Sequence, residues 1–191
     1  MKFKKVKFIS CFVFIALFGM GISRSFAQKI VILSPEGMKI DGSISYTVLG
    51  KYRAQFNAFK GRITFDDNLQ GIRSVYLVIK VNSIHSNSPW CDKMVRSKKL
   101  LNTARYPEIV FKSYKIIHDE GEYKVQGVLE MHGVKRRMIF PFKREGLDIK
   151  GSWNINRKDF NIIWSKTLDH GGVLVGDIFT VDWGLRLIHR N

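Results

Sequence analysis

The side chains that could carry chemistry in this chain are its five histidines and Cys91. Nucleophilic catalysis needs a serine or cysteine beside a base, with a third group that orients the base. Cys91 lies in no such motif, and its separation from His85 matches no metal-ligand spacing that we recognise. The histidines lie far apart in the sequence: His85, His118, His132, His170 and His189. We therefore expect a protein that is not an enzyme and has neither catalytic residues nor a metal site.

Two of these histidines have a simpler structural interpretation. His132 precedes Gly133 between two alternating apolar runs, so we expect a turn in which the ring caps backbone groups near Gly133. Asp169 and His170 precede two glycines, and this pair is interpreted first as part of a loop.

The first 27 residues have the pattern of a secretory signal peptide. Four lysines precede an apolar stretch at residues 8–22, and residues 25–27 read Ser-Phe-Ala, a small-x-small cleavage site. We expect export to the periplasm or secretion, with residues 28–191 forming one domain. Only Cys91 would survive cleavage, so no internal disulfide is expected.

The chain is strongly basic. Loss of the five basic residues of the leader would lower the formal net charge from +16 to +11. This excess suits contact with an anionic membrane surface or a phosphate-bearing ligand, although solvated strand faces explain it equally well. Export argues against nucleic acid, and the basic residues form no single tract.

Period-two alternation of apolar residues dominates the sequence after the leader. Such alternation places successive side chains on opposite faces of a strand. We expect strands in residues 43–48, 51–65, 74–81, 109–117, 123–131, 134–142 and 147–155, and a last strand through residues 181–187. Gly61 suggests a bend or bulge within the long second run. Seven or eight antiparallel strands indicate an all-β sandwich or barrel, and alternation alone does not choose between them.

One segment, residues 86–105, lacks this alternation. Helix-favouring residues follow Asp92, which is a plausible N-cap. We expect one or two short helices there.

The order of the short motifs resembles that of the YceI-like family over most of residues 44–187. Tyr106, Pro107, Ile109, Phe111 and Ser113 match its Tyr-Pro-x-Ile-x-Phe-x-Ser block in full. The other matches are short elements in the expected order: Phe56, Phe59, Gly61, Ile63, Phe65, Asp66, Ser83, Ile84, Asp92, Val95, Ser97, Val125, Gly127, Leu129, His132, Gly133, Val134, residues 156–160, Gly176 and Asp177.

The chain also departs from the family pattern at a few positions. Ala54 and Asn161 replace common glycines, residues 48–49 replace a common histidine position, and residues 100–101 replace an aromatic pair. These departures bear on the shape of a pocket more than on the fold.

The resemblance implies a lipocalin-like antiparallel β-barrel of about eight strands, periplasmic, with an apolar cavity for a polyisoprenoid, a quinone-like lipid or a similar long-chain amphiphile. It also suggests a setting in envelope stress, and transport or storage of the lipid. No other cofactor is expected. We predict that large apolar residues on the strand stripes line the cavity: Phe56, Phe65, Leu77, Phe111, Leu129, Phe140, Trp153 and Trp183. Arg157 is a candidate polar group near the mouth, and a salt bridge to Asp159 or Asp177 is its simpler interpretation.

An alternative function uses the same residues. A ligand-free stress or protein-interaction module would pack these apolar stripes into a filled barrel. An interior void above about 300 Å³, the lower end for ligand pockets, would favour the lipid carrier, and its absence would favour the filled module.

Overall fold

The structure is a computed structural model, and it describes residues 28–46, 50–66, 71–119, 122–163 and 175–187. Several sequence predictions lie outside the described residues: the leader at 1–27, the end of the strand at 43–48, the Asp169–His170 loop and His189. No described helix is long and apolar enough to cross a membrane.

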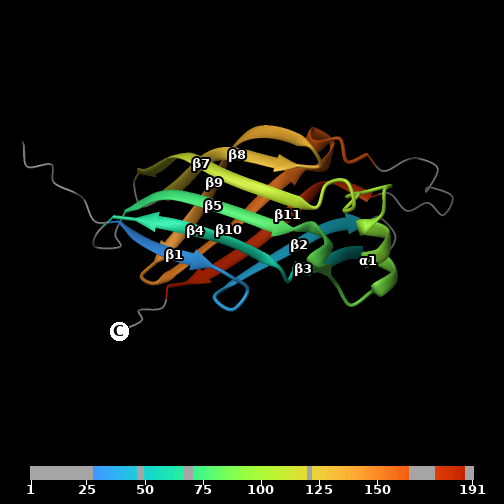
Figure 1. Ribbon diagram of the computed structural model, residues 1–191, viewed down its shortest axis with the longest axis horizontal. Coiled ribbons are helices and arrows are strands. Elements are labelled where there is room, and N and C mark those ends of the chain that lie inside the picture. Colours follow the sequence, from blue (N-terminus) through green and yellow to red (C-terminus); the bar gives the residue numbers. More distant parts are fainter. Residues whose placement is uncertain (1–27, 47–49, 67–70, 120–121, 164–174, 188–191) are drawn as a thin grey trace, which may run out of the picture.

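Antiparallel strands make up most of the described chain (Figure 1). The elements in chain order are β1 (Lys29–Leu33), β2 (Met38–Tyr46), β3 (Gly50–Phe56), β4 (Phe59–Phe65), β5 (Ile72–Lys80), the 3-10 helix η1 (Val81–Ser83), β6 (Ile84–His85), α1 (Pro89–Arg96), β7 (Glu108–Asp119), β8 (Glu122–Met131), β9 (Val134–Glu145), β10 (Asp148–Asn156), the 3-10 helix η2 (Arg157–Phe160) and β11 (Val175–Arg186).

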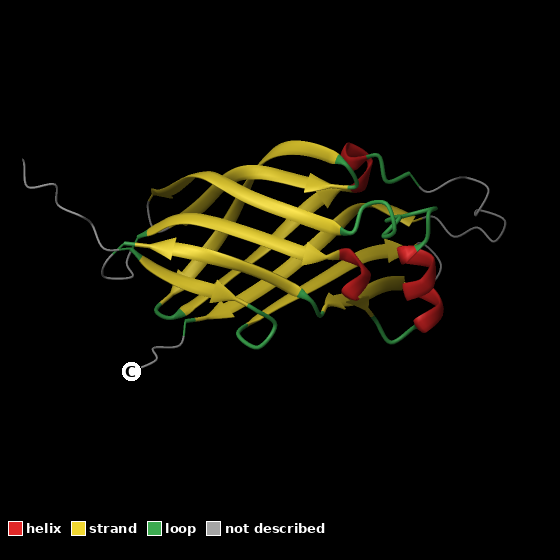
Figure 2. Cartoon of the chain, in the orientation of Figure 1, coloured by secondary structure: helices red, strands yellow, loops and turns green. Residues whose placement is uncertain are grey.

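All eleven strands belong to one sheet, in the order β1-β4-β5-β7-β8-β9-β10-β11-β2-β3-β6. The sheet curls so that front and back strands cross, and the helices gather at one end (Figure 2). The predicted all-β antiparallel barrel is confirmed. The strand number is higher than the eight expected, because β1 and the two-residue β6 are added and the run at 51–65 forms two strands.

The break in that run was predicted at the wrong place. It falls between β3 and β4, at residues 57–58, and β3 and β4 pair with different neighbours in the sheet. Gly61 instead lies inside β4, where a Cβ would come 2.3 Å from the carbonyl oxygen of Tyr76. The glycine therefore permits a close approach of β5, and it does not mark the predicted bend or bulge.

The predicted alternation is confirmed in β8. Val125, Leu129 and Met131 are buried on the inner face, while Lys124 and Glu130 lie on the other. The hairpin from β8 to β9 has two central residues, His132 (φ 51°) and Gly133 (φ 75°). Positive φ at both positions is typical of the type I′ turn that suits the twist of antiparallel strands.

Candidate lipid-binding interior

An apolar cavity lies inside the barrel, with a free volume of about 110 Å³. Residues of nine strands form its wall, and Val95, Leu100 and Leu101 close one end from α1 and the turn after it. Tyr52, Ser43 and Arg157 are the polar residues among its described lining. The chamber thus offers a largely hydrocarbon surface with polar groups at few points.

A second, smaller void of about 30 Å³ has residues near the β9–β10 hairpin, such as Phe142 and Ile149, in its lining. Leu77, Phe111 and Trp153 line both voids, so these side chains form the partition between them. Both volumes are below the 300 Å³ threshold that separates the two functional readings. By that criterion the interior in this conformation has the small free volume that is expected of the filled barrel.

The eight predicted lining residues fall into three groups. The main cavity is lined by six of them: Phe56, Leu77, Phe111, Leu129, Phe140 and Trp153. Trp183 lines the smaller void. Phe65 is fully buried in the core and is not among the lining residues of either void. Contact of any of these residues with a ligand stays a prediction.

Several lining residues were missed from the sequence. Ile44 and Phe179 lie on alternating stripes and could have been chosen by the same rule. Val95, Leu100 and Leu101 could not, because they come from the non-alternating segment, where no period identifies an inward face. The last two occupy the positions of the family's aromatic pair and still close the cavity.

Three neighbouring rings make up the aromatic layer, which we define as Phe111, Phe140 and Trp153. The Phe140 and Trp153 rings stack with centroids 4.1 Å apart, and Phe111 lies 5.6 Å and 6.1 Å from them. Trp153 Nε1 donates a hydrogen bond to the carbonyl oxygen of Pro141 at 2.9 Å. Trp183 meets Trp153 edge-on at 5.3 Å, but its own Nε1 is buried without a hydrogen-bond partner.

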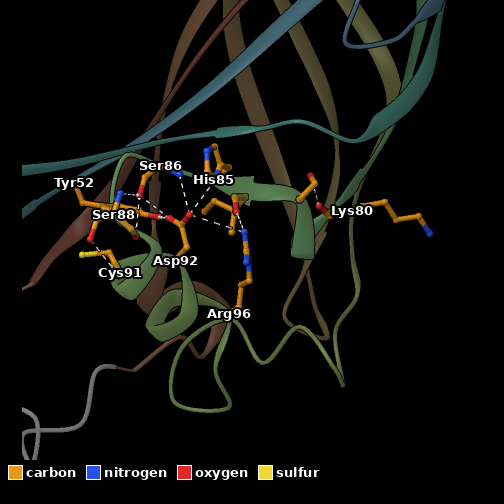
Figure 3. Close-up of polar contacts among 10 residues, drawn as sticks. Tyr52, Lys80, His85, Ser86, Ser88, Cys91, Asp92 and Arg96 are labelled. Atoms are coloured by element: carbon orange, nitrogen blue, oxygen red, sulfur yellow. Dashed lines mark hydrogen bonds and ion pairs between the residues drawn. The ribbon is translucent and has the colours of Figure 1, made fainter.

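A buried carboxylate fixes α1 across the end of the barrel (Figure 3). Asp92 is 3% exposed and accepts hydrogen bonds from Ser86 Oγ at 2.6 Å, Ser86 N at 3.0 Å and Tyr52 Oη at 2.9 Å. Its Oδ2 also lies 3.2 Å from His85 Nδ1. Burial opposes ionisation, but the hydrogen bonds from Ser86 and Tyr52 and the charge of Arg96 outweigh it and lower the pKa of Asp92.

The N-cap prediction for this helix was wrong. Ser88 is the N-cap, its hydroxyl accepts from Cys91 N at 3.4 Å, and Pro89 begins the helix. Asp92 lies in the first turn and points to β3, because Tyr52 and Ser86 supply donors there.

Arg157 performs the structural role that we considered simpler. It is 6% exposed, forms a 2.8 Å ion pair with Asp177, and donates to the carbonyl oxygens of Ile162, Gly176 and Val175. Lys158 also pairs with Asp177, and its hydrogen bond is the main reason that the pKa of Asp177 is lowered. These bonds fasten η2 to the start of β11.

His132 occupies the predicted turn but serves a more distant group. Its Nδ1 lies 3.1 Å from the carbonyl oxygen of Phe160, and its ring packs against Tyr106 with centroids 4.3 Å apart. The predicted capping near Gly133 was therefore wrong in its partner. Across the described residues, no three histidine, cysteine, aspartate or glutamate side chains gather into a possible metal site.

Comparison with known proteins decides the family. A family model described as the YceI-like domain matches residues 32–187. The chain belongs to the YceI-like family. It is 34% identical over 119 residues to a UPF0312 protein of Yersinia pestis and equally to one of Yersinia enterocolitica, which covers 56% of this chain and 61% of each relative. The YceI-like chain thus spans about three fifths of the length of these curated relatives.

Two solved structures share the YceI-like fold. BcnA of Burkholderia cenocepacia superposes with a TM-score of 0.69 at 20% identity, covering 79% of this chain and 96% of BcnA. A polyisoprenoid-binding domain of Saccharophagus degradans, implicated in plant cell wall breakdown, superposes with a TM-score of 0.60 at 16% identity, covering 82% and 95%. At these identities the likeness establishes the fold, which agrees with the lipocalin-like barrel expected from the sequence.

Proposed function

We propose that this YceI-like protein is an exported binding protein that holds a polyisoprenoid or similar long-chain lipid inside the barrel, for transport or storage. The observation that carries this proposal is an interior lined almost wholly by apolar side chains and divided into two voids by Leu77, Phe111 and Trp153. Family membership and the polyisoprenoid-binding domain of the same fold support the choice of lipid.

The energetics favour such a ligand over a small polar one. Moving several hundred Å² of hydrocarbon out of water at about 25 cal/mol per Å² yields on the order of 10 kcal/mol before ordering costs. A cavity with few polar groups obtains its affinity in this way and needs no catalytic machinery.

Binding requires the interior to enlarge. The two voids are too small for a long chain as they stand, and Trp153 lies between them. Rotation of the Trp153 side chain, with displacement of Leu77 and Phe111 beside it, would join the voids into one elongated tunnel. A bound lipid would then replace the ring contacts that the aromatic layer loses.

The test is to purify the full chain from an exporting host, extract it with organic solvent and analyse the extract and the intact complex by mass spectrometry. A stoichiometric isoprenoid or other long-chain lipid is the expected result. A matched control is a Leu129→Trp chain, in which a larger side chain fills the cavity and should reduce the lipid recovered.

A second function is favoured by the small free volume. A filled barrel acting as a ligand-free stress or protein-interaction module would need no room inside. Purified protein that carries no lipid, and that takes up none when refolded with isoprenoid, would support this module and contradict the carrier.

A further inference from the structure

The wall of the barrel is incomplete between β9 and β10. Among the described residues these strands pair only at the hairpin, where residues 148–150 face residues 145–143. On their other sides both strands are fully paired: β8 and β9 share nine residue pairs, and β10 and β11 share nine. We call the facing unpaired edges, residues 134–142 of β9 and 151–156 of β10, the seam.

The sequence of β9 fits an unpaired edge. Pro141 has no N–H to donate, and its carbonyl oxygen accepts the hydrogen bond from Trp153 Nε1 in β10. The N–H and C=O of one strand residue point toward the same neighbouring strand, so the missing donor also faces the seam. Proline within a sheet is confined to such edges. A side chain of β10 has therefore taken the place of the ladder at this point.

Two aromatic rings close the seam. Continuing the hairpin register would place Trp153 opposite Phe140, and their stacked rings join the two strands where backbone hydrogen bonds do not. Stacked rings separate more readily than a paired strand ladder, since a side-chain rotation suffices.

There is a groove outside these two rings and a void inside them. Outside, a groove of about 420 Å³ lies at the hairpin end of the seam, lined by Tyr123, Pro141 and Phe142. Its charged lining residues are Glu122 and the facing pair Lys143 and Lys150, and Lys150 also lies 3.0 Å from Glu145. Inside, Phe142 and Trp153 line the smaller void and Trp153 also lines the main cavity. Phe142 thus lines both the outer groove and the smaller void, and Trp153 lies between that void and the main cavity.

Both ends of the seam are fastened. At the hairpin end the strands pair normally. At the other end η2 crosses to β9, where Arg136 Nε donates to Asp159 O at 3.1 Å and His132 Nδ1 meets Phe160 O. An opening would therefore be limited to the middle of the seam.

The helical end of the barrel is a poorer entrance. Opening it would separate α1 from β3. The buried Asp92 carboxylate would then be exposed or would lose its hydrogen bonds from Ser86 and Tyr52. Losing partners from a buried charge costs several kcal/mol. Among the described residues, parting the stack of Trp153 and Phe140 breaks one side-chain hydrogen bond of these two residues, that of Trp153 to Pro141.

We propose that the seam between β9 and β10 is a side entrance through which the hydrocarbon chain of an amphiphile with an anionic head enters the barrel. The head remains in the outer groove near Lys143 and Lys150 while the chain passes Trp153. This inference rests on the proposed function, since an entrance matters only if the interior takes up lipid.

The test is a reversible lock across the seam. In a full chain carrying Cys11→Ser and Cys91→Ser, Ile139→Cys and Asn154→Cys place two thiols on the outer face of the opposing edges, where both positions are exposed. A short bis-methanethiosulfonate linker joins them and dithiothreitol releases them. The probe is dansyl-labelled farnesyl phosphate presented in phosphatidylcholine vesicles, with loading followed by energy transfer from tryptophan.

The matched control keeps one of the two cysteines. Asn154→Cys with Thr180→Cys joins β10 to β11, where these residues already face each other and share a 3.0 Å hydrogen bond. We expect the seam lock to slow loading by about tenfold or more, as a blocked conformational step does, and the control lock to leave the rate unchanged. Reduction should restore the rate of the seam variant.

The outcomes separate this inference from the function on which it rests. Equal loading rates in locked and released seam variants would overturn the side entrance while leaving lipid binding intact. A protein that takes up no probe even when it is refolded with the lipid would overturn the proposed function itself. Slow loading that dithiothreitol does not reverse would mean damage to the fold and would also count against the entrance.

Discussion

The ring of Trp153 lies almost parallel to that of Phe140, at an interplanar angle of 12° and a centroid distance of 4.1 Å, although their strands are not paired there. The tryptophan thereby fills the interior and holds the wall together. Because one side chain does both, its removal should affect stability and ligand exchange together.

Trp153→Ala should lower the free energy of unfolding by about 3–5 kcal/mol, the usual cost of deleting a large core aromatic. The same change should accelerate lipid exchange, because it joins the two voids. Urea denaturation and lipid transfer between vesicles measure the two effects. Trp90→Ala is the matched control: Trp90 is 69% exposed, and its loss should change stability by no more than about 0.5 kcal/mol. Slower exchange in the Trp153 variant would contradict this prediction.

Gly127 shows a second constraint on the interior. A Cβ at this position would come 2.5 Å from the ring of Phe111 and 2.7 Å from the carbonyl oxygen of Lys112. Gly127→Ala should therefore destabilise the fold by about 1–3 kcal/mol, since the backbone oxygen cannot move aside as a side chain can. Thermal unfolding measures the effect. Gly184→Ala in β11, where no atom lies within 4 Å of the added Cβ, is the control and should be close to neutral.

Much of the barrel could be predicted from local pattern. The alternating runs predicted β5, β7–β10 and the second half of β11, because burial of one face of a strand gives its apolar residues a period of two. Lining residues such as Leu77 and Leu129 followed from the same stripes. The alternation could not separate Phe65, which packs in the core, from Phe56, which lines the cavity, since both are large apolar residues facing inward.

Features that depend on partners distant in sequence were not predictable. Asp92 looked like a helix cap because aspartate favours that position, but its role is set by Tyr52, forty residues earlier. The ring of His132 meets a carbonyl 28 residues away. The seam had one local signal, Pro141 in the middle of an alternating run, which demotes a strand to an edge. Asn161, at a position where the family often has glycine, has a left-handed backbone (φ 55°), which asparagine tolerates.

The Asp92 cluster predicts how stability depends on pH. The folded pKa of Asp92 lies below its ordinary value of 3.8, so the ionised group stabilises the native state fully above that value and progressively less as the pH falls through the folded pKa. Asp92→Asn loses the charge-assisted bonds from Ser86 and Tyr52 and should cost about 2 kcal/mol at pH 7. Urea titrations at pH 7, 5 and 3 should show the gap between wild type and variant narrowing toward the lowest pH. Asp182→Asn, a change at an exposed position on β11, is the control and should give a gap near zero throughout. A wild-type advantage that grows as the solution is acidified would mean that Asp92 is not held ionised by these donors.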